Sequence, residues 1–112
     1  MQPKSRITFA NYLNSVSARL VHLRATKQTG VFTCGCELQA GKPRKCDKRF
    51  AETRVLRREE IEHASPAAML QKVYKQAVAL DSGFFGRIEV EIEIFQGIVV
   101  DTRKGITQTF QC

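Results

Sequence analysis

The sequence predicts an α+β fold, with a long N-terminal helix, a short Cys-containing hairpin, and a second helix packed on a C-terminal antiparallel β-meander. Two observations support this prediction. In two stretches apolar residues recur every three or four positions, which is the spacing of one helix face. Towards the C-terminus apolar and charged residues alternate, which is the spacing of a strand with one buried face. The 112 residues fit a single domain with one core.

The first helix is expected from Thr8 to about Lys27. Thr8 is a suitable N-cap, and Thr29-Gly30 offers a stop. The apolar face of this helix consists of Phe9, Leu13, Val16, Leu20, Val21 and Leu23. Its other side carries cations and residues 1–28 contain no acid, so the helix should be basic through Arg19, Arg24 and Lys27.

A short hairpin is expected next. Residues 31–34 have β character, Gly35 and then Gly41-Lys42-Pro43 supply turns, and the chain resumes at Lys45-Cys46. After it, Ser65 and Pro66 form a helix start, with serine as N-cap and proline at the first helical position. The apolar stripe of this second helix is Met69, Leu70, Val73, Tyr74, Ala77 and Val78.

The C-terminal third is expected to form the meander. In residues 87–94 four aliphatic residues alternate with one arginine and three glutamates, and Gln96-Gly97 turns the chain. The return strand is expected over residues 98–102. Lys104-Gly105 is then a second turn before a third strand from Ile106 to Phe110.

The segment from about Leu70 to Phe110 also shows a family resemblance. It contains a helix, a strand led by Gly86, and a turn at Gly97 before the return strand. This pattern resembles the small YezD-like domain of bacteria, which pairs a helix with a glycine-led strand and a glycine turn. The resemblance covers little more than a third of the chain. It implies an α+β arrangement and no particular chemistry.

The compartment is predicted from what the sequence lacks. No apolar run approaches the roughly 20 residues of a membrane helix, and no uninterrupted apolar stretch of a signal peptide follows the N-terminus. We therefore expect a cytoplasmic protein with no membrane partner. In that compartment the four cysteines should be reduced thiols or metal ligands, and a disulfide scaffold is not expected.

Charge is distributed unevenly along the chain. Residues 1–58 hold 13 Lys and Arg against three acids, whereas residues 59–112 hold five against eight, so the halves carry +10 and −3. A concentrated basic region suggests binding to nucleic acid or to an acidic protein surface. The alternative is a solvated face that keeps the protein soluble. The candidate binding residues are Arg19, Arg24, Lys27, Lys42, Arg44, Lys45, Lys48, Arg49, Arg54, Arg57 and Arg58.

Phe32 and Phe50 lie among these charges. Aromatic side chains can stack on bases, so both are candidates for contacts with single-stranded nucleic acid. The alternative is that they anchor the hairpin to the core.

Three cysteines are a candidate start of a structural zinc site. Cys34-Gly-Cys36 is followed by Cys46, and two thiolates on a turn with a third across a hairpin can begin a tetrahedral site. His63 is the preferred fourth ligand, with Cys112 and His22 as alternatives. The simpler interpretation is that these cysteines are small, partly buried residues of a hairpin.

The sequence does not indicate an enzyme, because His22 and His63 are the only histidines and no nucleophile or acid–base pair stands out. We expect a small non-catalytic protein that binds nucleic acid, DNA or RNA. The alternative is a phage-type inhibitor or adaptor, such as an anti-defence protein, that binds a nucleic-acid-processing machine. The row Glu89, Glu91 and Glu93 should be solubilising, or it could meet the basic half of another copy in a homo-oligomer.

Overall fold

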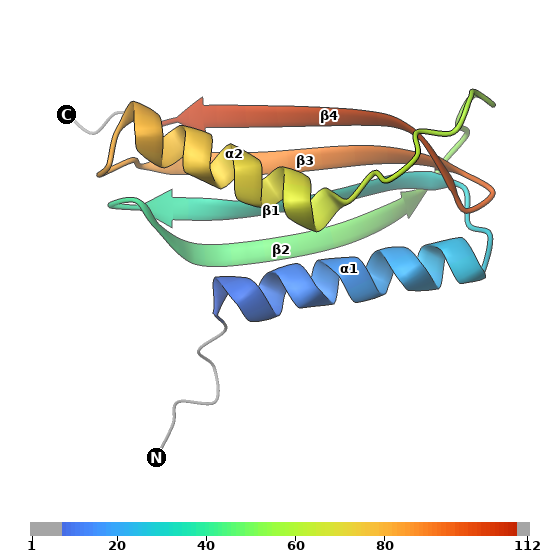
Figure 1. The fold of residues 1–112 in the computed structure, drawn as a ribbon, viewed down its shortest axis with the longest axis horizontal. Helices are drawn as coiled ribbons and strands as arrows, with labels where there is room; N and C mark the ends of the chain where they lie inside the picture. The colour runs from blue at the N-terminus through green and yellow to red at the C-terminus, as the bar shows by residue number, and fades with distance from the viewer. Residues whose placement is uncertain (1–7, 110–112) are drawn as a thin grey trace, which may run out of the picture.

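The computed structural model describes residues 8–109 and arranges them in two layers, a four-stranded antiparallel sheet and two helices on one of its faces (Figure 1). The predicted α+β class is confirmed, as is the order of helix, hairpin, helix and C-terminal strands. The elements are α1 (Phe9–Ala25), β1 (Gly30–Gln39), β2 (Lys42–Glu52), α2 (Pro66–Leu80), β3 (Gly86–Phe95) and β4 (Ile98–Gln108).

The sheet has the strand order β2-β1-β3-β4, so β1 and β3 are central and β2 and β4 are edges. The β1–β2 hairpin and the β3–β4 hairpin meet along the β1–β3 ladder, where Phe32 lies opposite Ile92. The basic half and the acidic half of the sequence therefore contribute two strands each to one sheet.

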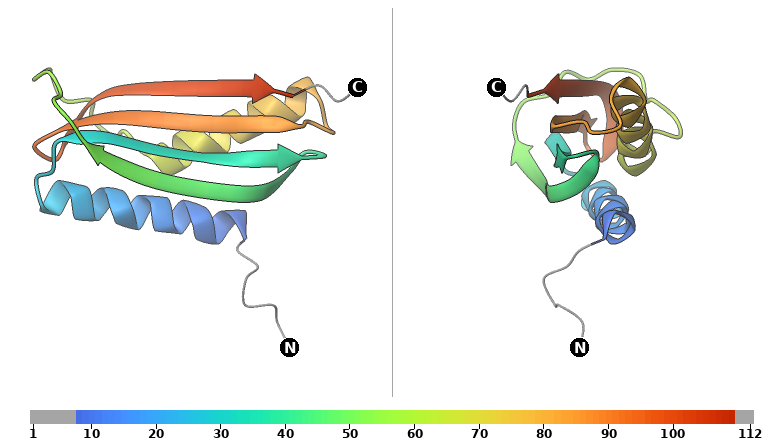
Figure 2. Two further views of the ribbon diagram at one scale, coloured as in Figure 1. Left: turned by 180° about the vertical axis from the view of Figure 1, so that it is seen from behind. Right: turned by 90° about the vertical axis from the view of Figure 1, so that its left-hand side faces the viewer.

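The helices begin where the sequence predicts. The Thr8 hydroxyl accepts a hydrogen bond from the Asn11 N–H at 3.1 Å, and the Ser65 hydroxyl accepts one from Ala68 at 3.2 Å. Both helices cover the same face of the sheet (Figure 2). Neither is long and apolar enough to cross a membrane. Between helices and sheet the largest fully buried side chains are Val16, Leu23, Phe32, Leu38, Leu70, Val73, Phe84, Ile88, Val90, Ile92, Ile94 and Val99.

Two predicted turns are strand interior in the structure. Gly35 pairs with Asp47 inside β1, and the hairpin turns at Ala40 and Gly41, which both have positive φ. Lys104 and Gly105 likewise pair with β3, so β4 continues through them. The predicted third strand is the end of β4, apart from Phe110, which lies outside the described residues. In both cases pairing with a neighbouring strand overrides the local turn preference.

The connection from β2 to α2, residues 53–65, which we call the strap, crosses the sheet face that the helices leave open. Figure 2 shows it passing from the β2 edge towards the β4 edge. The strap is held at three points. Val55 is buried, Arg58 bonds carboxylates of β3 and β4, and the Ile61 N–H donates to the Val99 carbonyl at 2.8 Å.

Candidate nucleic-acid interface

The edge strand β2 carries five of the predicted binding residues, and all five are exposed. Within residues 8–109 no carboxylate lies within ion-pair distance of any of them. The strand has 11 residues, so at ~3.3 Å per residue it extends over about 35 Å. We call these five residues the basic edge: Lys42, Arg44, Lys45, Lys48 and Arg49.

The basic edge points to both sides of the sheet. Lys45 lies opposite Glu37 and Arg49 opposite Thr33, on the open face. Lys48 lies opposite the buried Cys34 and so belongs to the helix side, where α1 runs alongside β2 (Figure 1). A partner reaching this edge would therefore meet cations above and below the strand.

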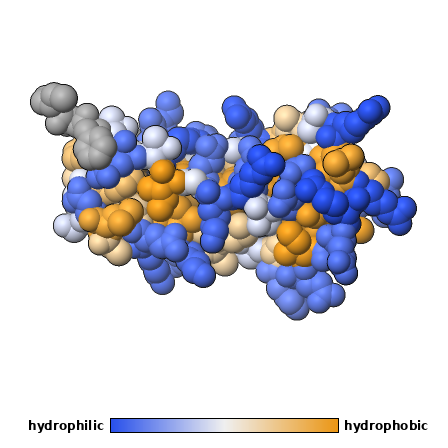
Figure 3. All heavy atoms as spheres, turned by 90° about the horizontal axis from the view of Figure 1, so that it is seen from above, coloured by the Kyte–Doolittle hydropathy of each residue, from blue (hydrophilic) through white to orange (hydrophobic). Residues whose placement is uncertain are grey.

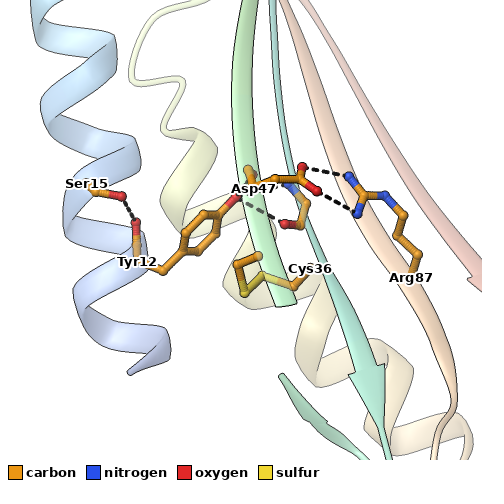
Figure 4. Close-up of a disulfide and its surroundings, with 7 residues drawn as sticks. Tyr12, Ser15, Cys36, Asp47 and Arg87 are labelled. Atoms are coloured by element: carbon orange, nitrogen blue, oxygen red, sulfur yellow. Dashed lines mark hydrogen bonds and ion pairs between the residues drawn. A yellow bond between two sulfur atoms is a disulfide. The ribbon is translucent and has the colours of Figure 1, made fainter. Parts of the chain in front are cut away.

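Asp47 is the acid in the middle of the basic edge, and its charge is compensated from another strand. Arg87 of β3 reaches across β1 and donates to both Asp47 carboxylate oxygens, at 2.9 and 3.2 Å (Figure 4). Gly35 of β1 leaves room for the Arg87 side chain, because a Cβ at that position would lie 2.7 Å from the Arg87 Nη2 atom. The hydrogen bonds from Arg87 to Asp47 raise the pKa of Arg87 above its ordinary value. The edge thus keeps its positive character.

Tyr12 of α1 connects the helix to both strands of the first hairpin. Its hydroxyl accepts a hydrogen bond from the Gly35 N–H at 3.0 Å and donates to the Asp47 carbonyl oxygen (Figure 4). Burial raises the pKa of Tyr12 above its ordinary range, so the hydroxyl stays protonated and remains a donor. This contact sets where α1 lies relative to the basic edge.

A disulfide joins Cys36 of β1 to Cys46 of β2, and the expectation of reduced thiols is wrong for this pair (Figure 4). The two residues are direct partners in the ladder, with Cα atoms 4.0 Å apart. The register of a hairpin brings them together, and the sequence alone does not reveal that register. Cys34 is a free, buried thiol, and burial raises its pKa from 9.0 to about 12.

The candidate zinc ligands are not gathered into a site. In the part of the chain that the structure describes, no three His, Cys, Asp or Glu side chains are arranged to hold a metal ion. His63 is an exposed residue of the strap with φ 59°, and Cys112 lies outside the described residues. The disulfide also uses two of the thiols that zinc would need, so a zinc site stays a prediction for the reduced chain only.

A second group of cations lies at the end of the sheet where β1 begins and β2 ends. Arg24 pairs with Glu60 at 3.6 Å, and Arg58 pairs with Glu93 at 2.9 Å and Asp101 at 3.3 Å. The hydrogen bond from the Thr102 N–H lowers the pKa of Asp101 below its ordinary value, and the nearby charge of Arg58 lowers it further. Lys27, Arg54 and Arg57 are exposed and have no acidic partner among residues 8–109.

The first helix contributes less to one continuous surface than the sequence suggests. Arg19 and Arg24 are five positions apart, so they lie about 140° apart around α1 and cannot face the same partner surface. The predicted cations therefore fall into the basic edge, the group at the sheet end, and Arg19 separately.

The two candidate stacking residues are core anchors. Phe32 is fully buried and lies opposite Phe50, which packs partly buried against the core. The Phe32 ring is closed to a base, whereas the Phe50 ring remains partly exposed. Charged side chains therefore make up most of the exposed surface of β2.

The Arg87–Asp47 bridge and the Tyr12 hydroxyl are parts of the site that the sequence did not indicate. A lone aspartate inside a run of cations was the available signal for the first, and nothing in the pattern marked the second.

Comparison with known proteins adds no relationship: the chain matches no family model, and no curated protein or solved structure is significantly similar to it.

Proposed function

We propose that this protein binds nucleic acid through the phosphate backbone, with the basic edge as its main contact surface. The observation that carries the proposal is the set of five exposed cations on one strand without carboxylate partners, beside an aspartate already bonded to Arg87. Such cations can bind phosphates without first breaking ion pairs. The resulting binding would be independent of sequence, because phosphate contacts do not distinguish bases.

The test compares two variants that remove the same charge. Arg44, Lys45, Lys48 and Arg49 are changed to Ser in one, and Lys72, Lys75, Arg103 and Lys104 in the other, so each loses four of the net +7 charges. Binding of the nuclease-treated proteins to labelled DNA and RNA, single-stranded and duplex, is measured by anisotropy across a salt series.

We expect salt-sensitive binding by the wild-type protein. If each of the four edge cations meets one phosphate, the slope of log affinity against log salt becomes shallower in the edge variant by about 3.6 for duplex DNA and by about 2.8 for single strands. The control variant should change much less. Equal losses in both variants would show that net charge alone drives binding, and salt-insensitive binding would contradict the proposal.

A second candidate, a protein inhibitor or adaptor, is favoured by the position of the same cations on a sheet edge. Within residues 8–109 no strand pairs with the outer side of β2, so an acidic segment of a partner could add to it as a further strand. A stoichiometric partner that the wild-type protein captures after nuclease treatment, and the edge variant does not, would favour this function over the first.

A further inference from the structure

The strap and the β3–β4 turn enclose a hollow of about 240 Å³ on the open face of the sheet. Arg57, Arg58 and Glu60 contribute from the strap, and Phe95, Gln96, Ile98 and Val100 contribute from the turn and the adjoining strand ends. Hydrophobic residues surrounded by hydrophilic ones are visible at this end of the molecule from the β4 side (Figure 3). Ile98, which lines the hollow, is 40% exposed.

The lining of the hollow combines three kinds of group. Phe95 is a partly exposed aromatic side chain and Ile98 an apolar wall, while the exposed Gln96 offers an amide that both donates and accepts hydrogen bonds. Arg57 has no acidic partner among the described residues, whereas Arg58 is already bonded to Glu93 and Asp101. The carboxylate of Glu60, which also lines the hollow, pairs with Arg24 at 3.6 Å. The group that such a lining suits is a flat polar ring next to an anion.

The size of the hollow limits what it can hold. Drug-sized ligands occupy pockets of about 300–1,000 Å³, and this hollow is smaller. Its position is also informative, because β2 ends at Glu52 and the strap continues from there through Arg54 to Arg57. A phosphate backbone that follows the basic edge would therefore be led towards the hollow.

We propose that the hollow binds one unpaired nucleobase, with Phe95 as the stacking surface and Arg57 on the adjoining phosphate. The inference rests on the proposed function and extends it from phosphates to bases. An unpaired base can enter the hollow only from a single strand, a strand end or a free nucleotide. The inference predicts a preference for single-stranded over duplex nucleic acid that phosphate contacts alone would not produce.

The test uses Phe95→Leu, with Phe85→Leu as the matched control. Phe85 is likewise partly exposed, and it lines a different hollow, beside Leu38 and Arg87. Single-stranded oligonucleotides containing 2-aminopurine report both affinity and base stacking through their fluorescence, and the matching duplex is titrated in parallel. Ile98→Trp is a second variant, which fills the hollow from an exposed position and does not depend on how well F95L folds.

We expect F95L to weaken single-strand binding by roughly 5- to 100-fold, in line with the loss of one base–aromatic stack, and to leave duplex binding unchanged. Ile98→Trp should act in the same direction, and F85L should bind like the wild-type protein. A nucleoside monophosphate titrated by calorimetry separates the two sources of the base. If the wild-type protein binds the nucleoside monophosphate and F95L does not, the hollow accepts free nucleotides. If the wild-type protein prefers single strands but does not bind the nucleoside monophosphate, the hollow accepts bases of strands only.

The failures are distinguishable. Salt-sensitive binding with equal affinity for single strand and duplex, unchanged in F95L and Ile98→Trp, overturns the base site and leaves the proposed function standing. If no nucleic acid binds even at low salt and no nucleotide binds, both fall.

Discussion

Strands β2 and β3 are both rich in charge, yet their charges are arranged differently. The outward carboxylates of β3 all lie near an arginine, with Glu89 3.9 Å from Arg87, Glu91 4.0 Å from Arg103, and Glu93 2.9 Å from Arg58. The cations of β2 have no such partners in the described part of the chain. Arg87 belongs to β3 itself, Arg103 to the neighbouring strand β4, and Arg58 to the strap that crosses this face. The free cations of β2 are therefore the charges that remain available to a ligand.

The largest expected effect on stability comes from the disulfide, which holds the edge strand and leaves β3 untouched. Replacing Cys36 and Cys46 with Ser opens a loop whose ends are 10 positions apart, and this should lower the free energy of unfolding by about 2–3 kcal/mol. Urea unfolding of the variant, and of wild-type protein with and without dithiothreitol, measures the loss. Hydrogen exchange should accelerate in β2 more than in β3, and equal acceleration would remove the contrast between them.

Tyr12→Phe tests the second attachment of the edge strand. The change removes the hydroxyl that serves the Gly35 N–H and the Asp47 carbonyl, and we expect a loss of about 1–3 kcal/mol in the free energy of unfolding. Tyr74→Phe is a control, because its hydroxyl donates to a single carbonyl, that of Gly41 at 2.8 Å. A loss in Y12F no larger than in the control would mean that the two-strand contact adds nothing.

Alkaline pH should weaken the same region. Burial raises the pKa of the Cys34 thiol from 9.0 to about 12, and burial raises that of Tyr12 as well. These groups ionise at lower pH in the unfolded chain than in the folded one. Their contribution to the free energy of unfolding is therefore fully present below about pH 9 and is lost as the pH rises towards 12. The free energy of unfolding should therefore fall steadily as the pH rises through this range. Urea midpoints at several pH values measure it, and Cys34→Ala should show a shallower decline.

The smallest expected effect on stability is that of the bridge between the two strands. Arg87→Met breaks a partly exposed ion pair, which should cost about 1 kcal/mol or less. It also leaves Asp47 uncompensated on the basic edge, so affinity for nucleic acid should fall. Asp47→Asn in the same background should restore that affinity. Unchanged binding in Arg87→Met would show that the bridge has no electrostatic role in the interface.

Much of the fold followed from local patterns. Thr8, Ser65 and Pro66 mark the helix starts, and the alternation in β3 marks a strand with one buried face. What could not be predicted depends on pairing between distant segments. Gly35 reads as a turn until β2 and β3 flank it, and the Cys36–Cys46 bond depends on a register that only the folded hairpin defines.

In the candidate site, too, local features could be predicted from the sequence and contacts between distant segments could not. The cations themselves could be recognised from the sequence, because exposed Lys and Arg need no tertiary context. The sequence could not show which cations lack an acidic partner. Arg24 and Arg58 are bonded to acids far along the chain, whereas Lys45 and Arg49 are not. Phe32 proved to be a core residue and Phe50 a partly buried residue packed against the core, because their strand face is turned towards the helices.

The strand order has a consequence for how the molecule assembles. The two hairpins are local, but the ladder that joins them pairs residues such as Cys34 and Val90, 56 positions apart, and closing so long a loop is slow. The basic edge belongs entirely to the first hairpin. The hollow needs the strap and the β3–β4 turn together. We therefore expect a folding chain to acquire its phosphate-binding strand early, and to become able to hold a base only when its two halves have joined.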